Sequence, residues 1–85
     1  MVEFLVKVEV TLKKTVADPQ GQAVYSALRD MGFEGTREVR VGKLIEVRVE
    51  GEDREHARSL VDEMCRRLLA NPVIEDYRLE VGVDG

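Results

Sequence analysis

The chain has few of the residues from which active sites and metal centres are usually built. Its 85 residues include one cysteine, one histidine, one asparagine and no tryptophan. A single cysteine cannot close an internal disulfide, and it cannot form a zinc site that requires paired cysteines. One histidine and one asparagine also leave little material for a catalytic triad. The composition therefore argues against an enzyme with an active site of its own.

The charge balance excludes further classes of partner. Acidic residues outnumber basic ones by 17 to 13, which gives a formal net charge of −4. A broad grip on nucleic acid needs clustered lysine and arginine. No apolar stretch approaches the roughly 20 residues needed to cross a bilayer, and the first residues lack the pattern of a secretory signal. We therefore expect a cytoplasmic protein that binds neither nucleic acid nor membrane.

The length indicates one domain that spans residues 1–85. A chain this short buries only about 60% of the surface that its unfolded form exposes, so its core is thin. Small domains without disulfides or metals often gain stability by association. We expect a homo-oligomer, and the sequence leaves a dimer and a tetramer both open.

Apolar and polar residues alternate almost without interruption from Val2 to Leu12. A period of two places six apolar side chains on one face of a β-strand and mostly polar ones on the other. Strands of this kind are typical of antiparallel sheets that are covered on a single side. The six residues are Val2, Phe4, Val6, Val8, Val10 and Leu12.

A helix is predicted next. Asp18 suits the N-cap position, and Pro19 suits the first helical position. Gly32 can end the helix in a left-handed conformation. Between them, an apolar stripe at the spacing i, i+3, i+4, i+7 predicts an amphipathic face. That stripe consists of Val24, Ala27, Leu28 and Met31.

Residues 37–50 favour one long strand that bends or bulges at Gly42. Most of the apolar residues in this segment then share one face. The alternative is a hairpin that turns at Gly42-Lys43. Its pairing would turn Ile45 and the two valines that follow to the wrong side of the sheet, so we prefer the single strand.

A second amphipathic helix and a last strand complete the chain. The segment Gly51-Glu52-Asp53 turns the chain and caps this helix, and Asn71-Pro72 ends it. The apolar stripe of the helix contains Ala57, Leu60, Val61, Met64 and Leu68, widened by Cys65 and Leu69. The strand carries Val73, Tyr77, Leu79, Val81 and Val83 on one side, and Glu75 interrupts that row.

The elements follow the order β-α-β-α-β and predict an α+β fold. The economical arrangement packs both helices on one face of a small, mostly antiparallel sheet with a long, bent middle strand. Such a sheet has two exposed edges and much apolar surface for its size. Since a second copy would cover both, we expect the sheet to be extended by dimerisation.

The single histidine and the single cysteine both favour structural roles. As a general base, His56 would need an orienting acid and a nucleophile within reach, and Ser59 is the only hydroxyl nearby. Cys65 lies past the middle of the second helix, away from the helix N-terminus that activates thiolates. We interpret His56 as a solvated surface residue and Cys65 as a half-buried structural residue.

Three segments carry a specific resemblance. They are residues 18–21 (Asp-Pro-Gln-Gly), residues 39–47 around Gly-Lys-Leu-Ile-Glu, and residues 64–77, which end in Leu-Leu-Ala-Asn-Pro-Val-Ile-Glu-Asp-Tyr. In these segments the chain resembles the PurS family, the small subunit of phosphoribosylformylglycinamidine synthase (formylglycinamide ribonucleotide amidotransferase). The resemblance covers essentially the whole chain. One departure is Leu44, where members of the family often carry an aromatic residue.

The resemblance implies a part in the fourth step of de novo purine biosynthesis. That step converts formylglycinamide ribonucleotide, ATP and glutamine into formylglycinamidine ribonucleotide, ADP, phosphate and glutamate. It implies a non-catalytic adaptor that docks a glutaminase subunit to a larger synthetase subunit and assists the transfer of ammonia. ATP and magnesium would then be used by the synthetase, and we expect no cofactor, metal or catalytic residue in this chain.

Seven polar residues are candidate contacts with the partner subunits. Three lie on the middle strand, and four lie at the junction before the last strand. Asn71-Pro72 has the alternative role of a simple helix stop. The seven candidates are Arg40, Lys43, Glu46, Asn71, Glu75, Asp76 and Tyr77.

Two functions from other classes are alternatives. A stand-alone dimeric ligand-sensing domain of the ACT type would carry a glycine-containing loop after the first strand, whereas residues 13–17 contain no glycine. An independent small enzyme is disfavoured by the poverty of catalytic residues.

Overall fold

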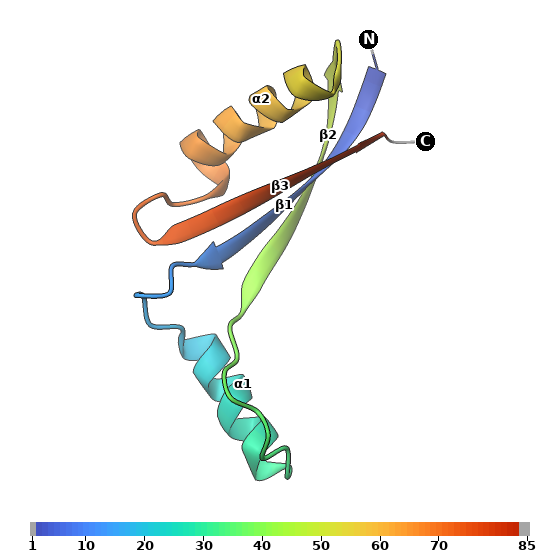
Figure 1. Cartoon of the computed structure of the whole chain (residues 1–85). Coiled ribbons are helices and arrows are strands. Elements are labelled where there is room, and N and C mark those ends of the chain that lie inside the picture. The colour runs from blue at the N-terminus through green and yellow to red at the C-terminus, as the bar shows by residue number, and fades with distance from the viewer. Residues whose placement is uncertain (1, 84–85) are drawn as a thin grey trace.

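The computed structural model of the chain describes residues 2–83 and confirms the predicted order of elements (Figure 1). Strands and helices alternate, and the second helix ends in a π-helical turn. No helix among the described residues is long and apolar enough to cross a membrane. The elements are β1 (Val2–Leu12), α1 (Pro19–Asp30), β2 (Gly42–Gly51), α2 (Arg54–Met64), the π-helical turn η1 (Cys65–Leu69) and β3 (Glu75–Val83).

Strand β1 is the centre of an antiparallel sheet with the order β2-β1-β3. In this register Val6 lies opposite Val47 of β2 and Val81 of β3. Because successive side chains of a strand point to opposite faces, the apolar residues of all three strands gather on one face. The predicted α+β class with an antiparallel sheet is therefore confirmed.

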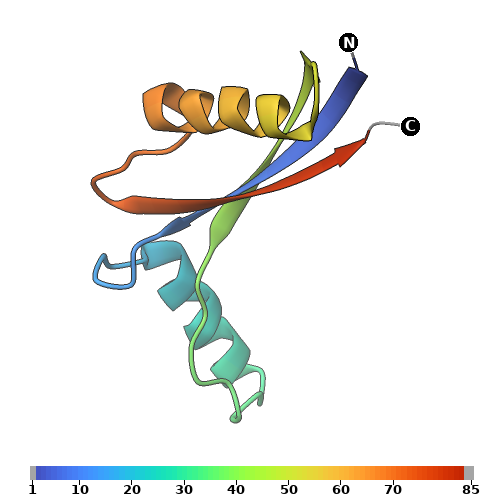
Figure 2. The same ribbon diagram turned by 45° about the horizontal axis from the view of Figure 1, so that its top comes forward.

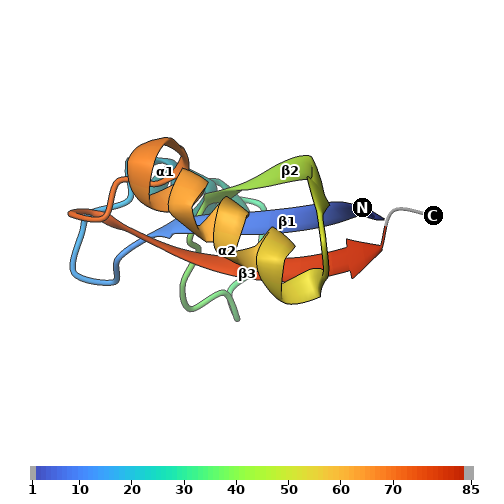
Figure 3. The same ribbon diagram turned by 90° about the horizontal axis from the view of Figure 1, so that it is seen from above.

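Helix α2 lies across this apolar face and contacts all three strands (Figures 1 and 3). The predicted apolar face of β1 forms the centre of the core, since Val6 and Val8 are completely buried. Arg54 at the start of α2 also donates a hydrogen bond to the carbonyl of Val81, which ties the helix to β3. The buried core residues are Phe4, Val6, Val8, Val10, Ala57, Val61, Cys65 and Ala70.

The buried stripe of the second helix differs from the prediction, since Leu60 and Met64 are each 36% exposed, and it differs most near the end of the helix. Cys65 is completely buried rather than half-buried, whereas Leu68 is 83% exposed. The π-helical turn is the cause, because the amide of Ala70 donates to the carbonyl five residues earlier, that of Cys65, at 3.0 Å. The wider turn brings Leu69 and Ala70, in place of Leu68, toward the sheet.

Helix α1 does not pack on the sheet, which corrects the prediction of two helices on one face. It extends beyond the end of the sheet, away from α2 (Figures 1 and 2), and makes no extensive contact with another helix or strand of residues 2–83. Its predicted apolar stripe is open, with Val24 42% and Met31 71% exposed. The helix begins directly after Asp18, and hydrogen bonds hold this residue beside Val41, beyond the end of the sheet.

Strand β2 begins at Gly42, so the long-strand prediction is right from this residue onward and wrong for residues 37–41. Gly42 and Lys43 both lie within β2, and the hairpin alternative is wrong. Residues 37–41 instead run alongside α1 (Figure 2). The amide of Val41 donates to the side chain of Asp18 at 2.8 Å and is therefore engaged outside the sheet.

Strand β3 begins at Glu75, the residue that interrupts the predicted apolar row. Tyr77, Leu79 and Val81 pack against the core, whereas Val73 precedes the strand and is 78% exposed. The side chain of Val83, predicted on the same face, lies outside the described part of the structure.

The face of the sheet opposite α2 is not packed against α1, which makes no extensive contact with any strand of the described residues. We call it the open face. It carries the odd-numbered residues of β1 and the even-numbered residues of β2 and β3. Most of these residues are charged, so this face is left to solvent or to another molecule.

The packing of α2 on β1 predicts a clear difference between two valines. Val61→Ala removes two methyl groups from a completely buried site, whereas Val73→Ala removes them from a site that is 78% exposed. Urea unfolding at one protein concentration should show a loss of about 2 kcal/mol for V61A and less than about 0.5 kcal/mol for V73A. Equal losses would contradict the position of the core.

Candidate subunit-contact site

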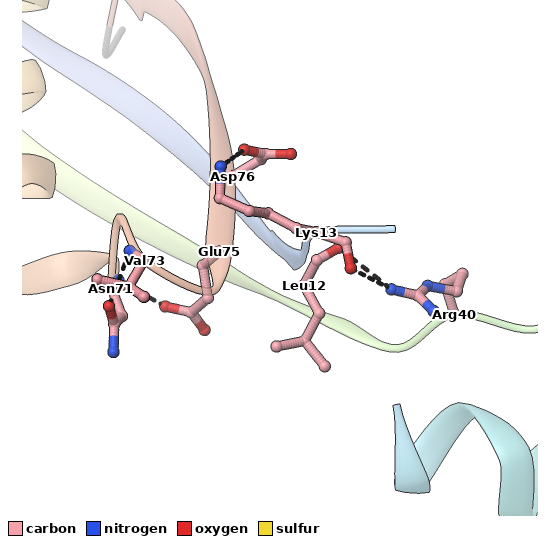
Figure 4. A network of polar contacts seen from close by, with 7 residues as sticks. All are labelled: Leu12, Lys13, Arg40, Asn71, Val73, Glu75 and Asp76. Carbon is pink, nitrogen blue, oxygen red and sulfur yellow. Dashed lines mark hydrogen bonds and ion pairs between the residues drawn. The ribbon is translucent and has the colours of Figure 1, made fainter. Parts of the chain in front are cut away.

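Three segments that are distant in the sequence meet at the end of the sheet nearest α1. They are the connection after β1, the residues before β2 and the turn before β3 (Figure 4). Five of the seven predicted contact residues lie in this region. These five are Arg40, Lys43, Asn71, Glu75 and Asp76.

The turn before β3 is closed by its own polar groups. The side-chain oxygen of Asn71 accepts a hydrogen bond from the amide of Val73 at 3.0 Å, and its carbonyl accepts one from the amide of Glu75 at 2.7 Å. The Glu75 carboxylate in turn accepts a hydrogen bond from the backbone amide of Asn71 at 2.7 Å. Such side-chain turns satisfy the backbone groups that a helix end leaves unpaired. Closing this turn is therefore a structural role that explains the presence of Asn71 and Glu75 without a partner subunit.

Lys13 connects the three segments. Its amide donates to the carbonyl of Ile74 at 2.9 Å, and its ammonium group forms an ion pair with Asp76 at 3.0 Å. Its carbonyl accepts a hydrogen bond from the Arg40 guanidinium at 2.9 Å. Arg40 also reaches the carbonyls of Leu12 and Val16, each at 3.3 Å. Arg40 thus holds the connection after β1 in place.

Asp18 joins the start of α1 to the segment before β2. One carboxylate oxygen accepts the amide of Gly21 at 2.9 Å, and the other accepts the amide of Val41 at 2.8 Å. These two hydrogen bonds, in that order, and the nearby charge of Arg40 hold the pKa of Asp18 below its ordinary value. Burial raises the pKa of Asp18, and its effect is smaller than that of either hydrogen bond but larger than that of Arg40. The carboxylate is therefore stabilised in its charged form.

Gly21 makes this close approach possible. A Cβ atom at this position would lie 2.3 Å from the carbonyl oxygen of Val39, a separation that real side chains do not tolerate. The Asp-Pro-Gln-Gly segment is therefore explained by packing: Asp18 caps the helix and Gly21 admits the neighbouring backbone.

The other predicted contact residues lie in different settings. Lys43 is exposed at the start of β2, where it lines a shallow hollow with Asp18 and Glu75. Tyr77 points toward α2, and its hydroxyl donates to Asp62 at 2.6 Å, which raises the pKa of Tyr77. Glu46 lies on the open face opposite Lys7, away from the end of the sheet where five of the other contact residues gather.

The described residues hold no assembled catalytic constellation. No group of three or more potential ligands among residues 2–83 is placed to hold a metal ion. His56 is half-buried rather than solvated, because its Nδ1 accepts the amide of Glu52 at 3.0 Å. Burial raises the pKa of the Cys65 thiol, with a smaller effect from Asp62, which disfavours a reactive thiolate.

Sequence reasoning missed two residues of this region. Lys13 gave no signal beyond being one of two lysines after a strand, and its role depends on partners up to 63 residues away. Asp18 was predicted as a helix cap, and this is confirmed, but its second hydrogen bond crosses 23 residues to Val41. A capping pattern reports only local neighbours, so the sequence alone held no sign of this contact.

Comparison with known proteins identifies the family. The family model PurS, described as phosphoribosylformylglycinamidine (FGAM) synthase, matches residues 5–82. The chain belongs to the PurS family. It is 53% identical over 78 residues to phosphoribosylformylglycinamidine synthase subunit PurS of Bacillus subtilis, covering 92% of each chain. It is 45% identical over 72 residues to the PurS subunit of Methanocaldococcus jannaschii, covering 85% of this chain and 87% of that one.

Solved PurS structures share the fold. The crystal structure of PurS from Methanocaldococcus jannaschii matches with a TM-score of 0.86 and 38% identity, covering 96% of this chain and 99% of that one. A chain in the structure of PurLQS from Thermotoga maritima matches with a TM-score of 0.88 and 33% identity, covering 95% and 99% respectively. The resemblance inferred from the three sequence segments is therefore confirmed.

The two hydrogen bonds of Asp18 predict a pH-dependent effect of Asp18→Asn. The variant should melt several degrees below the wild-type chain at pH 7, because an amide cannot accept both backbone N–H groups. The folded-state pKa of Asp18 is lowered, so its contribution is complete above the unfolded value of about 4 and is lost as the pH falls through the folded pKa. The difference in melting temperature should therefore shrink between about pH 4 and pH 2.

The exposed Asp30 at the end of α1 provides the matched control. Asp30→Asn should melt within about 2 °C of the wild-type chain at every pH, since an exposed charge at a helix end has a small effect. A D18N difference that stayed constant down to pH 2 would refute the role of the carboxylate.

Proposed function

We propose that this chain is the non-catalytic adaptor subunit of a glutamine- and ATP-dependent phosphoribosylformylglycinamidine synthase. In this function it docks a glutaminase subunit to a synthetase subunit and assists the transfer of ammonia between them. Its fold match to a chain of the PurLQS structure, with nearly complete coverage of both chains, is the observation that carries the proposal. The chain then takes part in an ATP-dependent carbon–nitrogen ligase reaction without an active site of its own.

The chemistry of an amidotransferase explains why a small adaptor is useful. Ammonia released from glutamine must reach an activated amide before it becomes ammonium in bulk water. Holding two active sites in one assembly raises the effective concentration of the transferred molecule. This task needs recognition surfaces and a rigid scaffold, and it needs neither a nucleophile nor a metal. ATP and magnesium belong to the synthetase in this proposal, and the complex works in the cytoplasm.

The ligand-sensing alternative finds no support. The connection after β1, residues 13–18, lacks the glycine-containing loop expected of an ACT-type domain. The hydrogen bonds of Arg40 and Asp18 tie this connection to the segment before β2. The relatives reported above are all described as PurS subunits.

We further propose that two copies of the chain associate through α1. This helix carries an apolar stripe that no other helix or strand of residues 2–83 covers extensively. Met31 is 71% exposed and Phe33, just beyond the helix, is 56% exposed. Exposed apolar side chains gathered on one helix are typical of interaction sites. Burying them against a second copy would also supply the apolar surface that a thin core lacks.

The self-association proposal predicts a loss of oligomer in Met31→Glu. The new carboxylate would be buried at the interface of both copies, which should weaken association at least about tenfold. Sedimentation equilibrium would measure this change. Leu68→Glu is the matched control, because Leu68 is 83% exposed on η1 rather than on α1. Monomeric L68E together with oligomeric M31E would overturn the assignment to α1.

The adaptor function predicts a selective loss of one activity. Glutaminase and synthetase subunits from the same source should form product from glutamine at least about tenfold faster when this chain is present, because docking raises the effective ammonia concentration. The rate with ammonium chloride in place of glutamine should change by less than about twofold. The two rates would be measured by product formation at saturating ATP.

The result with glutamine decides the proposal. If product formed from glutamine equally fast without the chain, the adaptor function would be refuted. The ammonium-dependent rate serves as the control for synthetase quality, since it tests the synthetase without a need for ammonia transfer.

A further inference from the structure

The open face of the sheet is arranged in rows across the three strands. In the middle row Glu46 of β2, Lys7 of β1 and Glu80 of β3 lie side by side. One lysine therefore stands between two carboxylates, and this row has a net charge of −1. Side chains directly opposite one another on one face of a sheet are close neighbours.

Ion pairs neutralise other charges of this face. Arg78 binds Glu9 at 2.6 Å, and Arg48 lies 4.0 Å from Glu3. Lys13 pairs with Asp76 at the end of the face. Glu50, by contrast, lies opposite Glu3, which gives a second row with two carboxylates.

The carboxylates of this face outnumber its cations. Six acidic residues stand against four basic ones when Lys13 is included, a net charge of −2. Three carboxylates of this face form no ion pair within residues 2–83, and two of them, Glu46 and Glu50, lie on the edge strand β2, whereas Glu80 lies on β3. The acidic residues are Glu3, Glu9, Glu46, Glu50, Asp76 and Glu80, and the basic ones are Lys7, Lys13, Arg48 and Arg78.

The open face also offers apolar contact. Leu44 on β2 is 58% exposed beside Glu9, and the half-buried Leu5 lies opposite Arg48. An exposed leucine among charges resembles the mixture of apolar anchors and a polar rim found in protein interfaces. The exposed Leu44 therefore marks the β2 side of the open face as the region of contact.

The charge of this face indicates the kind of partner. A second copy meeting it face to face would bring two carboxylate-rich surfaces together, which is unfavourable. Nucleic acid is repelled for the same reason. We propose that the open face docks a lysine- and arginine-bearing surface of a different protein chain, with Glu46 at the centre of the contact. This inference rests on the proposed function, because the partner belongs to the same synthase complex.

The two surfaces then have separate tasks. The apolar stripe of α1 serves self-association, and the acidic open face serves a different chain. They are formed by different elements of the chain, α1 and the three strands (Figure 1). An adaptor needs this separation, because one surface cannot hold two partners at the same time.

Charge reversal at Glu46 tests this inference. Glu46→Lys should raise the dissociation constant for one of the two partner subunits about tenfold at about 0.05 M NaCl, because opposite charges at an interface become like charges. The effect should fall toward about twofold at about 0.5 M NaCl, where salt screens exposed charges. Calorimetric titration of the full-length chain into purified glutaminase and into purified synthetase would measure it.

Glu52→Lys is the matched control. Glu52 is exposed in the connection between β2 and α2, and its carboxylate forms no hydrogen bond or ion pair within the described residues. E52K changes the net charge by the same amount as E46K, and its dissociation constants should stay within about twofold of wild type. Glu46→Gln, which removes the charge without reversing it, should give an intermediate increase in the dissociation constant. This variant tests the role of Glu46 even if E46K does not fold.

The outcomes separate this inference from the adaptor function. If wild-type chain supports glutamine-dependent synthesis but E46K and E46Q bind both partners like E52K, the open-face inference is overturned and the adaptor function stands. If the wild-type chain does not accelerate glutamine-dependent synthesis, the adaptor function itself fails. Weaker self-association of E46K, with unchanged partner binding, would also overturn the inference by assigning the face to a second copy.

Discussion

The pairing of β1 along both of its edges is the constraint on which the rest of the structure depends. A strand bonded on both sides lies in the middle of the sheet, and the alternation from Val2 to Leu12 decides which of its faces belongs to the core. Helix α2 covers the face of β1 that carries Phe4, Val6, Val8 and Val10. The end of the strand, at Lys13, then becomes the point where Arg40 and the turn before β3 attach.

This arrangement divides the chain into a packed core and two surfaces that we propose for recognition, α1 and the open face. The core is confined to the contact between α2 and the sheet, so neither α1 nor the open face is needed to bury it. Residues on these surfaces are therefore free to serve partners with little cost to folding. Hydrogen bonds of Arg40 and Asp18 tie the start of α1 to the connection after β1 and to the segment before β2.

Local patterns predicted most of the fold, and contacts between distant segments account for what they missed. The alternation in β1, the caps at Asp18 and Asp53 and the left-handed Gly32 are properties of neighbouring residues, and each is confirmed. The position of α1 is not local, since an amphipathic stripe shows that a face needs cover without showing which molecule provides it. Five of the seven candidate contacts gather at one end of the sheet, but their roles as partner contacts remain predictions.

The π-helical turn η1 gives the second helix one residue more than a regular helix would need for the same length. A π-helical turn absorbs one extra residue locally, so removing one residue from this segment would restore a regular helix and leave the parts on either side in register. Removing one residue from the regular part of α2 would instead rotate everything after it by about 100° around the helix axis and carry Ala70 out of the core. The length of the chain between Cys65 and Asn71 is therefore less constrained than the length of α2.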